Sequence, residues 1–376
     1  MKTIKVVLAG LGFGSCCLPI YLDHPNVHAL GILDTDEERL NRMKAEYPEV
    51  ELYHSLEEVL SDVSVDAVHL VTPIPYHADQ TVKVLDSGKH CACTVPMATS
   101  LEDIRRIVEA KRRNGKNYMM METTLYTYQF FYVKEMIEKG ELGRIQFLRG
   151  SHYQDMIGWP WYWEGLPPMW YGTHAIGPMV ALSGSRIKKV NCYGSGTMDE
   201  ASHEKYGNPY PVESALFAFE NGLKGEATRS LFETTRAYQE GLFVYGSNAS
   251  FEWNLEDGGE PYVTRNVPPT EGARGSWPVV TMETMPNYHE RLPESIQKYT
   301  VGDNFDPQNP QASLKEGRGG GHHGSHPHLV HEFVMSIIEE RKPWIDEHLG
   351  GNITAAGICA HESAMHDGET VFVPEF

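Results

Sequence analysis

The chain has 376 residues, which is long enough for two domains that each bury a complete core. Its formal net charge is −19, from 32 basic and 51 acidic residues, and this balance disfavours nucleic acid and anionic membranes as partners. No apolar run is long enough to span a bilayer, and the strand pattern begins so early that we expect no signal peptide. The six cysteines lack C-x-x-C spacing, so we expect reduced core thiols and a cytoplasmic protein.

The first 34 residues are the most informative stretch of the sequence. An apolar run from Ile4 to Ala9 is followed by Gly10-Leu11-Gly12-Phe13-Gly14-Ser15 and by a helical segment to about Asp23. A second apolar run, residues 28–33, ends at Asp34. A dinucleotide-binding unit typically has this order of features: a strand, a glycine-rich turn, a helix, a second strand and an acidic residue.

The glycine-rich loop predicts NAD as the cofactor. Gly10 permits a tight turn, and Gly12 lets a pyrophosphate approach the backbone, with Phe13 and Gly14 completing the loop. The following helix start offers free N–H groups to the phosphates. Asp34 is placed to accept hydrogen bonds from the ribose and would repel a 2′-phosphate, so NAD is favoured over NADP. The alternative is a glycine-rich turn that serves packing alone.

Strand and helix patterns alternate up to residue 122 and predict a Rossmann domain, a doubly wound parallel sheet, over residues 1–122. We expect its strands at residues 4–9, 28–33, 50–53, 65–71, 91–95 and 118–121. Ligands of such sheets bind beyond the carboxyl ends of the strands. The further cofactor-binding residues expected at these ends are Thr72, Pro73, His77, Thr94, Pro96 and Glu122.

Residues 123–376 predict a second, α+β domain. A helix near residues 128–139 precedes strand patterns that indicate an antiparallel sheet, at residues 145–150, 187–193, 214–219, 222–230, 241–246 and 249–253. Residues 254–325 have little periodicity and predict ordered excursions or partner-contacting arms. Helical patterns return at residues 327–339 and 352–365, and we expect the last helix to pack back on the Rossmann domain.

Tryptophans cluster in the second domain. Trp159, Trp161, Trp163 and Trp170 fall within twelve residues. Aromatic faces stack on sugar rings and indole N–H groups bond hydroxyls, so these four are candidate substrate-binding residues. The alternative is a core or subunit-contact loop, because aromatic residues also dominate interfaces.

Tyr171 and His174 are candidate catalytic residues. They are three positions apart, so at a helix start both side chains point to one face. Together they could pass protons to and from a sugar. A purely structural histidine is the alternative.

Histidines are dense at residues 322–331. A metal site is conceivable there, but the stretch has no cysteine, and a glycine-rich loop that brings histidines to a polar pocket is the simpler interpretation. We therefore predict no metal, and we assign His323 and His326 to the substrate.

These features resemble the Gfo/Idh/MocA family over essentially the whole chain. The resemblance lies in the glycine fingerprint, in Thr72-Pro73 with His77, in Val95-Pro96 and in Tyr245-Gly246-Ser247-Asn248-Ala249. It implies a Rossmann domain followed by a domain built on an open, mostly antiparallel sheet, and an NAD(P)-dependent sugar or cyclitol dehydrogenase. It also implies a homo-oligomer, a dimer or tetramer, paired through the second sheet.

The sequence departs from the family's dehydrogenases at two catalytic positions. Val95 stands where their Glu-Lys-Pro motif has the catalytic lysine, and Trp170 stands where an aspartate precedes the histidine by four positions. The chain is more similar to the family's NAD-dependent glycosidases, such as the α-N-acetylgalactosaminidases. Those carry Val-Pro and a Tyr-Pro-Thr-His-x-x-Gly-Pro stretch, and residues 171–178 match this stretch except at Gly172. The glutamate that precedes Val-Pro in the glycosidases is replaced here by Thr94.

The glycosidase resemblance implies a redox-neutral reaction. A hydride leaves C3 of the sugar, the ketone acidifies the C2–H, the C1 substituent is eliminated, water adds and the hydride returns. His174 and Tyr171 would handle the protons, with Tyr126 as a third candidate. A simple sugar 3-dehydrogenase and a non-catalytic NAD- or sugar-binding protein remain as alternatives.

Overall fold

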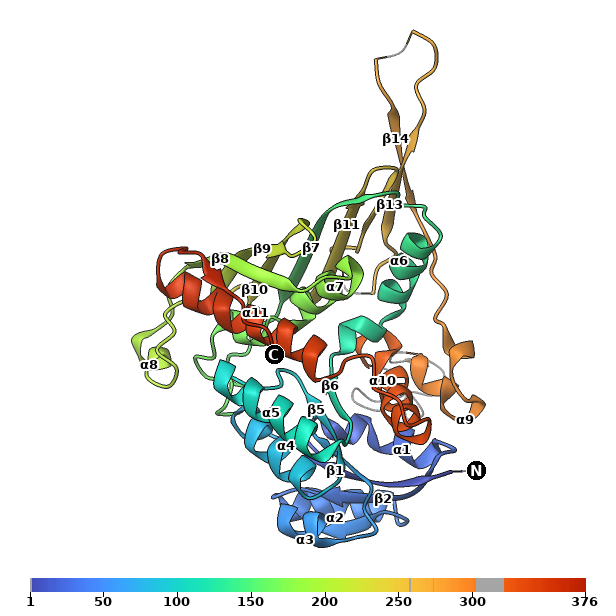
Figure 1. Ribbon diagram of the computed structural model, residues 1–376, viewed down its shortest axis with the longest axis vertical. Helices are drawn as coiled ribbons and strands as arrows, with labels where there is room; N and C mark the ends of the chain where they lie inside the picture. The colour runs from blue at the N-terminus through green and yellow to red at the C-terminus, as the bar shows by residue number, and fades with distance from the viewer. Residues whose placement is uncertain (1, 257, 273, 302–320) are drawn as a thin grey trace. The chain divides into compact units, whose positions relative to one another are not determined.

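A computed structural model describes residues 2–256, 258–272, 274–301 and 321–376 (Figure 1). The chain forms two compact units. The first comprises Met1–Thr127, Asn287–Gly351 and Phe376, and the second comprises Tyr128–Pro286 and Asn352–Glu375.

The division between the units differs from the expected boundary. The first unit ends at Thr127, whereas the sequence predicts a boundary after Glu122. Residues 287–351 also belong to the first unit. The expected packing of the last helix on the Rossmann domain stays a prediction. Helix α11, Glu347–Met365, groups with the first unit up to Gly351 and with the second unit from Asn352 onward. Its Asn352 side chain exchanges hydrogen bonds with both backbone groups of Ile187, at 2.9 and 3.0 Å, which ties the helix to the second sheet.

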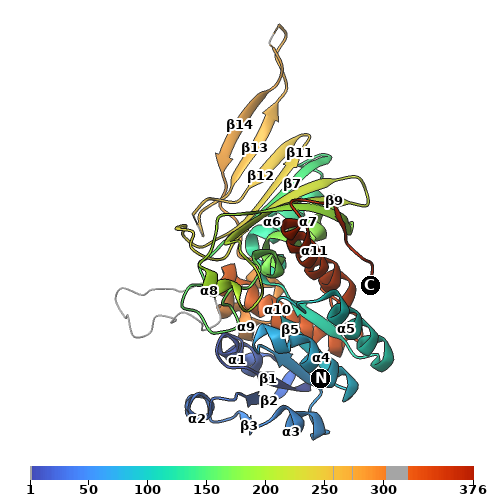
Figure 2. The same cartoon turned by 90° about the vertical axis from the view of Figure 1, so that its left-hand side faces the viewer.

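The first unit contains a six-stranded parallel sheet in the order β3-β2-β1-β4-β5-β6 (Figure 2). All six predicted strands are confirmed, as β1 (Ile4–Ala9), β2 (Val27–Leu33), β3 (Glu51–Tyr53), β4 (Ala67–Leu70), β5 (His90–Thr94) and β6 (Tyr118–Met121). The strands β1 and β4 are fully buried and mostly apolar, which is typical of a sheet covered on both faces.

Short helices connect these strands. They are η1 (Gly14–Cys16), α1 (Leu18–Asp23), α2 (Glu37–Glu46), α3 (Leu56–Ser61), η2 (Ile74–Tyr76), α4 (His77–Asp86), α5 (Leu101–Asn114) and η3 (Thr123–Tyr126). Ser100 caps α5 by accepting from the Asp103 N–H at 3.1 Å, and Gly115 ends the helix with a left-handed φ of 65°. Later residues add η5 (His289–Arg291), α9 (Glu294–Gln297), η6 (Lys298–Thr300) and α10 (Gly321–Ile338).

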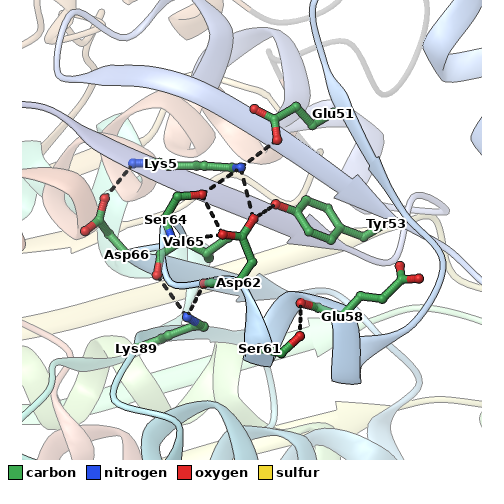
Figure 3. A network of polar contacts seen from close by, with 10 residues as sticks. All are labelled: Lys5, Glu51, Tyr53, Glu58, Ser61, Asp62, Ser64, Val65, Asp66 and Lys89. Carbon is green, nitrogen blue, oxygen red and sulfur yellow. Dashed lines mark hydrogen bonds and ion pairs between the residues drawn. The ribbon is translucent and has the colours of Figure 1, made fainter.

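A polar network ties together the amino ends of the strands (Figure 3). The Lys5 ammonium donates to Glu51 at 2.5 Å, Ser64 at 3.1 Å and Asp62 at 3.3 Å. Asp62 also accepts from the Tyr53 hydroxyl at 2.6 Å. Burial lowers the pKa of Lys5, but the hydrogen bonds to these partners outweigh it and hold the pKa above its ordinary value. Hydrogen bonds from Ser64, Tyr53 and Lys5 lower the pKa of Asp62.

Replacing Lys5 by methionine should therefore destabilise the fold. We expect Lys5→Met to lower the free energy of unfolding by about 2 kcal/mol, because Glu51 and Asp62 lose their shared cation. Urea denaturation measures this change. The matched control is Lys2→Met, whose exposed pair with Glu340 should contribute under about 0.5 kcal/mol. Equal effects of the two substitutions would contradict the network's role.

The same network predicts a pH dependence of stability. The folded-state pKa of Asp62 is depressed, so its contribution is present above the unfolded pKa of about 4 and is lost as pH falls toward the folded value. The pKa of Lys5 is raised, so its contribution is present below about pH 10 and is lost only at higher pH.

The second unit is built on a nine-stranded sheet in the order β14-β13-β12-β11-β7-β10-β9-β8-β15. Its strands are β7 (Ile145–Tyr153), β8 (Ile187–Ser195), β9 (Val212–Phe219), β10 (Lys224–Ser230), β11 (Gln239–Gly246), β12 (Ala249–Glu252), β13 (Tyr262–Val267), β14 (Trp277–Met282) and β15 (Val371–Phe372). β7 and β10 pair in parallel and the other neighbours are antiparallel, which confirms the predicted open, mostly antiparallel sheet.

Helices cover one face of this sheet (Figure 2). They are α6 (Tyr128–Glu138), α7 (Thr173–Ser183) and α11, with η4 (Pro168–Tyr171) before α7 and α8 (Glu200–His203) in a loop. Gly150 of β7 is required for this packing, because a Cβ there would lie 2.0 Å from the Ala175 carbonyl oxygen of α7.

Residues 254–325, whose sequence has little periodicity, include a β-hairpin. β13 and β14 pair antiparallel and extend beyond the rest of the sheet as an arm (Figure 1). All six residues of β14 are exposed, including Trp277 at 75%. Residues 302–320 of the same expected segment lie outside the described residues.

All six cysteines are buried free thiols, which agrees with the expected reduced core residues. Burial raises the pKa of Cys93 to about 12, so that its thiol stays protonated. Within the described ranges, none of the helices combines the length and apolarity that a membrane-spanning helix requires.

Candidate functional site

Two glycines of the glycine-rich loop, Gly10 and Gly12, differ in the space around them. Gly10 has a φ of 95°, and a Cβ there would lie 2.3 Å from the Val71 carbonyl oxygen. A Cβ on Gly12 would meet nothing within 4 Å. The protein's own packing therefore requires a glycine at residue 10, whereas the open space over Gly12 fits an approaching pyrophosphate.

Asp34 lies beside this loop at the carboxyl end of β2. Its carboxylate accepts from the Leu11 N–H at 2.7 Å and from the Asp36 N–H at 2.9 Å, and Arg39 approaches it at 3.1 Å. Arg39 Nη1 also lies 3.3 Å from the other carboxylate oxygen, so these contacts occupy the roughly four acceptor positions of the carboxylate, and a ribose hydroxyl would bind in place of the partly exposed Arg39. Arg39 was missed in the sequence because its place, within a charged helix, is typical of a solvated side chain.

His77 connects two of the predicted cofactor-binding loops. Its ring nitrogens lie 2.7 Å from the Thr72 carbonyl oxygen and 2.8 Å from that of Pro96. Burial lowers the pKa of His77, although both hydrogen bonds oppose the shift. The buried ring thus holds the loops after β4 and β5 in place, close to Thr94, whose hydroxyl lies 3.5 Å from Nε2. Pro73 begins the first loop, before η2.

Glu122 and Tyr126 lie at the end of the sixth strand. Glu122 is buried and caps η3, accepting from the Thr124 N–H at 3.1 Å and its hydroxyl at 2.8 Å. The Tyr126 ring is buried against Trp344, with centroids 5.7 Å apart. Burial raises the pKa of Tyr126 well above its ordinary value. This environment favours the neutral phenol, and hence proton donation over proton removal.

The histidine cluster divides into two parts. His322 and His326 contact the Phe13 ring edgewise, with centroids 5.9 and 5.5 Å away, so α10 begins against the glycine-rich loop. His331 instead pairs with His24 at 3.0 Å. Burial, and then the charge of His331, lowers the pKa of His24 to about 3.

The backbone at the start of α10 is unusual. His322 and His323 have left-handed φ values of 48° and 52°, followed by Gly324 at 74°. A Cβ on Gly324 would lie 2.3 Å from the Thr300 carbonyl oxygen, which requires glycine there. Among the described residues, no group of three or more His, Cys, Asp or Glu is arranged to hold a metal ion.

Tyr171 and His174 meet at the start of α7 in the second unit. Their ring centroids are 5.3 Å apart, and His152 of β7 lies 4.9 Å from His174 and 6.3 Å from Tyr171. Tyr238 adds an edge contact to His152 at 5.4 Å, and its hydroxyl donates to Glu240 at 2.6 Å. The predicted pair is therefore part of a larger cluster of ionisable side chains.

A buried arginine supports this cluster. Arg229 of β10 is fully buried and donates to the Tyr171 carbonyl at 3.0 Å and to the His152 carbonyl at 3.2 Å. Its guanidinium also lies 5.5 Å from the centroid of the Tyr171 ring. Burial lowers the pKa of Arg229 to about 10, so the group remains a cation at neutral pH. A fixed positive charge next to Tyr171 would stabilise negative charge that develops there.

Glu213 positions the turn that carries Tyr171. It is fully buried in β9, accepts from the Met169 N–H at 2.7 Å and pairs with His361 at 2.6 Å. The His361 ring lies edge-on to Trp170, with centroids 5.8 Å apart. The acid thus reaches this turn from β9, whereas the family's dehydrogenases carry an aspartate at the position of Trp170 in the turn itself.

The tryptophans predicted to bind substrate lie in a connected aromatic wall. Trp163 lies 4.6 Å from the Tyr171 ring, and Trp159 lies 6.2 Å from Trp163, by centroids. Trp163 is buried, whereas Trp159 and Trp161 expose 52% and 51% of their surface. Lys205 lies over the Trp161 ring at 4.0 Å. The wall connects the Tyr171–His174 pair to the molecular surface.

Sequence reasoning missed Arg229, His152, Tyr238, Glu240, Glu213 and His361. A signal existed for Arg229, because it lies within the predicted strand 222–230 and a charged residue in a buried strand seldom lacks a role. Glu213 falls one position before the predicted strand 214–219. The others are ordinary strand or helix residues, and only the fold brings them together.

Comparison with known proteins identifies the two units by sequence. Residues 4–122 match the profile described as "Oxidoreductase family, NAD-binding Rossmann fold". Residues 130–252 match the profile described as "GFO/IDH/MocA C-terminal domain".

Two curated proteins illustrate the range of similar chains. A 1-carboxy-3-chloro-3,4-dihydroxycyclohexa-1,5-diene dehydrogenase of Comamonas testosteroni is 26% identical over 275 residues, 71% of this chain and 65% of the relative. A glycosyl hydrolase family 109 protein of Porphyromonas gingivalis is 24% identical over 259 residues, 63% of this chain and 54% of the relative. The chain thus spans between half and two thirds of the length of these relatives.

Solved structures agree on the fold. Levoglucosan dehydrogenase in complex with NADH and L-sorbose matches with a TM-score of 0.77 at 20% identity, over 100% of both chains. The glycine-rich loop, the two sheets and both profile matches therefore lead to one assignment: the chain belongs to the Gfo/Idh/MocA family of oxidoreductases, and its first unit is an NAD-binding Rossmann domain.

Proposed function

We propose that this protein uses NAD to oxidise a ring carbon of a sugar or glycoside, within a redox-neutral cleavage of the glycosidic bond. The observation that carries the proposal is the cluster of Tyr171, His174 and buried Arg229. The cluster occurs in a chain that has Val95 and Trp170 in place of the lysine and aspartate of the family's dehydrogenases. The name of the glycosyl hydrolase family 109 relative supports the cleavage half of the proposal.

The cofactor would be held by Gly10, Gly12, Phe13, Gly14 and Asp34, with Thr72, Pro73, His77, Thr94, Pro96 and Glu122 forming or supporting the adjoining loops. The open space over Gly12 and the carboxylate beside the loop fit a pyrophosphate and a ribose. When bound, NAD supplies a hydride acceptor that can also return the hydride.

The side chains of the second unit would move the protons. Tyr171, as a phenolate that the Arg229 cation stabilises, would take the proton of the hydroxyl that is oxidised and become the neutral phenol. His174 would remove the C2 proton, which an adjacent ketone acidifies, and would return it after water adds. Tyr126 of the first unit, a neutral phenol, is the third candidate for these proton transfers. No pair of acid and base carboxylates is needed, unlike in most glycosidases.

The aromatic wall would hold the substrate. Trp159, Trp161, Trp163 and Trp170 offer flat faces for a sugar ring, and His323 and His326 would contribute hydrogen bonds. Three buried polar atoms around the cluster, Trp170 Nε1, Thr173 Oγ1 and Ser230 Oγ, have no hydrogen-bond partner among the described residues. Hydroxyl groups of a ligand would satisfy them.

A plain NAD-dependent sugar or cyclitol dehydrogenase is the second candidate. It is favoured by the names of the Comamonas dehydrogenase and of levoglucosan dehydrogenase. The two candidates differ in whether reduced cofactor accumulates. The test is to supply NAD with levoglucosan, myo-inositol and a panel of p-nitrophenyl glycosides. Release of the leaving group without net formation of NADH would support cleavage. An increase in NADH that matches the loss of substrate would support dehydrogenation and contradict the redox-neutral reaction.

We also propose that the chain forms a homo-oligomer through the second unit. β14 exposes Trp277, Val279, Val280 and Met282 on both of its faces, and monomers rarely leave such a strand uncovered. The opposite end of the sheet adds Leu216. The hairpin segment, residues 262–282, carries two arginines and one glutamate in a chain of net charge −19, so a second copy is an electrostatically suitable partner.

Removing the exposed indole should weaken this assembly. We expect the wild-type chain to sediment as a dimer or tetramer at micromolar concentration and Trp277→Lys to shift toward the monomer, because a charge replaces a central apolar contact. Analytical ultracentrifugation measures the change. Val63→Lys, at a 99% exposed valine of the first unit, is the matched control and should leave the assembly intact. A monomeric wild type would refute the proposal.

A further inference from the structure

A pocket of about 220 Å³ lies in the second unit at the outer end of the aromatic wall. Its apolar lining includes Met156, Trp159, Met198 and Phe232, of which all but Trp159 are buried. Two glutamates, Glu164 and Glu233, complete the lining, and both are exposed to solvent. The pocket therefore brings together buried apolar side chains, a half-exposed tryptophan and two exposed glutamates.

The walls of the pocket are held together by the backbone. The Met156 N–H donates to the Leu231 carbonyl at 2.9 Å, and the Met198 N–H donates to the Pro209 carbonyl at 3.1 Å. A Cβ on Gly165 would lie 2.1 Å from the Ser202 carbonyl oxygen, so the two wall segments meet closely there. These contacts make the pocket part of the folded unit before any ligand binds.

The backbone at Glu233 is unusual for this residue type. Its φ of 48° is left-handed, a conformation that is unfavourable for residues other than glycine. A glycine would relieve this strain, yet the position carries a glutamate that lines the pocket.

The pocket is separated from the Tyr171–His174 pair by the aromatic wall. The contacts run from Trp159 to Trp163 at 6.2 Å and from Trp163 to Tyr171 at 4.6 Å. A ligand that reacts at Tyr171 and is longer than one ring would extend along these faces toward the pocket.

We propose that this pocket binds a second sugar ring, so that the substrate is a disaccharide or a longer saccharide rather than a monosaccharide. The Trp159 face would stack on the ring, and Glu164 and Glu233 would accept hydrogen bonds from its hydroxyls. The inference rests on the proposed function for the reacting ring, but the pocket's own affinity for sugar does not depend on turnover.

Binding without turnover tests the proposal. Saturation-transfer NMR and intrinsic tryptophan fluorescence would be recorded on the full chain with maltose, cellobiose and lactose, and with methyl α- and β-glucoside and methyl β-galactoside. We expect at least one disaccharide to bind about tenfold more tightly than the methyl glycoside of its non-reducing sugar, a difference worth about 1.4 kcal/mol. Equal affinities for every such pair would overturn the proposal.

Variants at Glu233 make the test specific. Glu233→Gly removes the carboxylate while easing the backbone, so the protein should remain folded, and Glu233→Gln keeps the size of the side chain. Both should weaken disaccharide binding several-fold and methyl glycoside binding less. The control Glu204→Gln removes an exposed charge two positions from the pocket residue Ser202, but Glu204 itself does not line the pocket. Equal losses for both ligand types, or the same loss in Glu204→Gln, would overturn the assignment.

The two proposals fail in different ways. If disaccharides bind through Glu233 but no NAD-dependent reaction follows, the proposed function is wrong and the pocket assignment stands. If NAD-dependent cleavage occurs with equal efficiency on methyl glycosides and disaccharides, the proposed function stands and the pocket assignment is wrong.

Discussion

Gly12→Ala should abolish most NAD binding and leave the fold intact. The added methyl group meets no protein atom within 4 Å, so we expect an unchanged melting temperature. It would occupy the space into which the pyrophosphate must come, and overpacking of this kind costs about 1–3 kcal/mol, or roughly a ten- to hundredfold loss of affinity. Calorimetric titration with NAD and a thermal melt of the same sample measure both quantities.

Gly10→Ala is the matched comparison, two residues earlier in the same loop. Here the Cβ would lie 2.3 Å from the Val71 carbonyl oxygen at a φ of 95°, so the chain must move. We expect a loss of stability as well as of NAD binding. If Gly12→Ala lowered the melting temperature as much as Gly10→Ala, or bound NAD as tightly as the wild type, the loop would not be the pyrophosphate site.

Tyr171→Phe and His174→Gln should each lower kcat by roughly a hundred- to ten-thousandfold, the usual value of a positioned proton-transfer group. Tyr171→Phe removes one oxygen and keeps the ring contacts with Trp163 and Arg229. The backbone carbonyl that Arg229 binds is also kept. NAD affinity should not change, because the cofactor-binding residues belong to the first unit.

A histidine elsewhere in the second unit provides the control for this pair. His366 is exposed, and its Nδ1 lies 2.8 Å from the Glu362 carbonyl oxygen, four positions earlier. His366→Gln should retain wild-type kcat. Full activity of Tyr171→Phe would remove the proposed proton transfer by that hydroxyl, and full activity of His174→Gln would remove the proposed base.

The first unit follows closely from its sequence, because local signals suffice there. The glycine fingerprint, the acid at Asp34 and the buried strands are all read from neighbouring residues, and each strand pairs as its βα connections predict. The sequence does not predict that residues 287–351 belong to this unit. No local feature of α10 indicates that its first residues contact Phe13, more than 300 positions earlier.

The hairpin illustrates a different limit. Strands are recognised by alternation between a buried and an exposed face, and β14 exposes both. Its residues therefore lack the period-2 signal, although a tryptophan, two valines and a threonine favour a strand. Distant contacts also explain Arg229 and Glu213, whose roles arise from pairing between distant strands and from contacts with η4 and α11.

The central claim is that oxidation at one sugar carbon drives bond cleavage at another, and the fate of the C2 hydrogen tests it most directly. The protein with NAD would be incubated in heavy water with p-nitrophenyl α- and β-glycosides of glucose, galactose and N-acetylgalactosamine, and the released sugar examined by NMR. The account predicts release that requires NAD, no net NADH and deuterium at C2 of the product. Release that proceeds without NAD, or a product that keeps its C2 hydrogen, would contradict it.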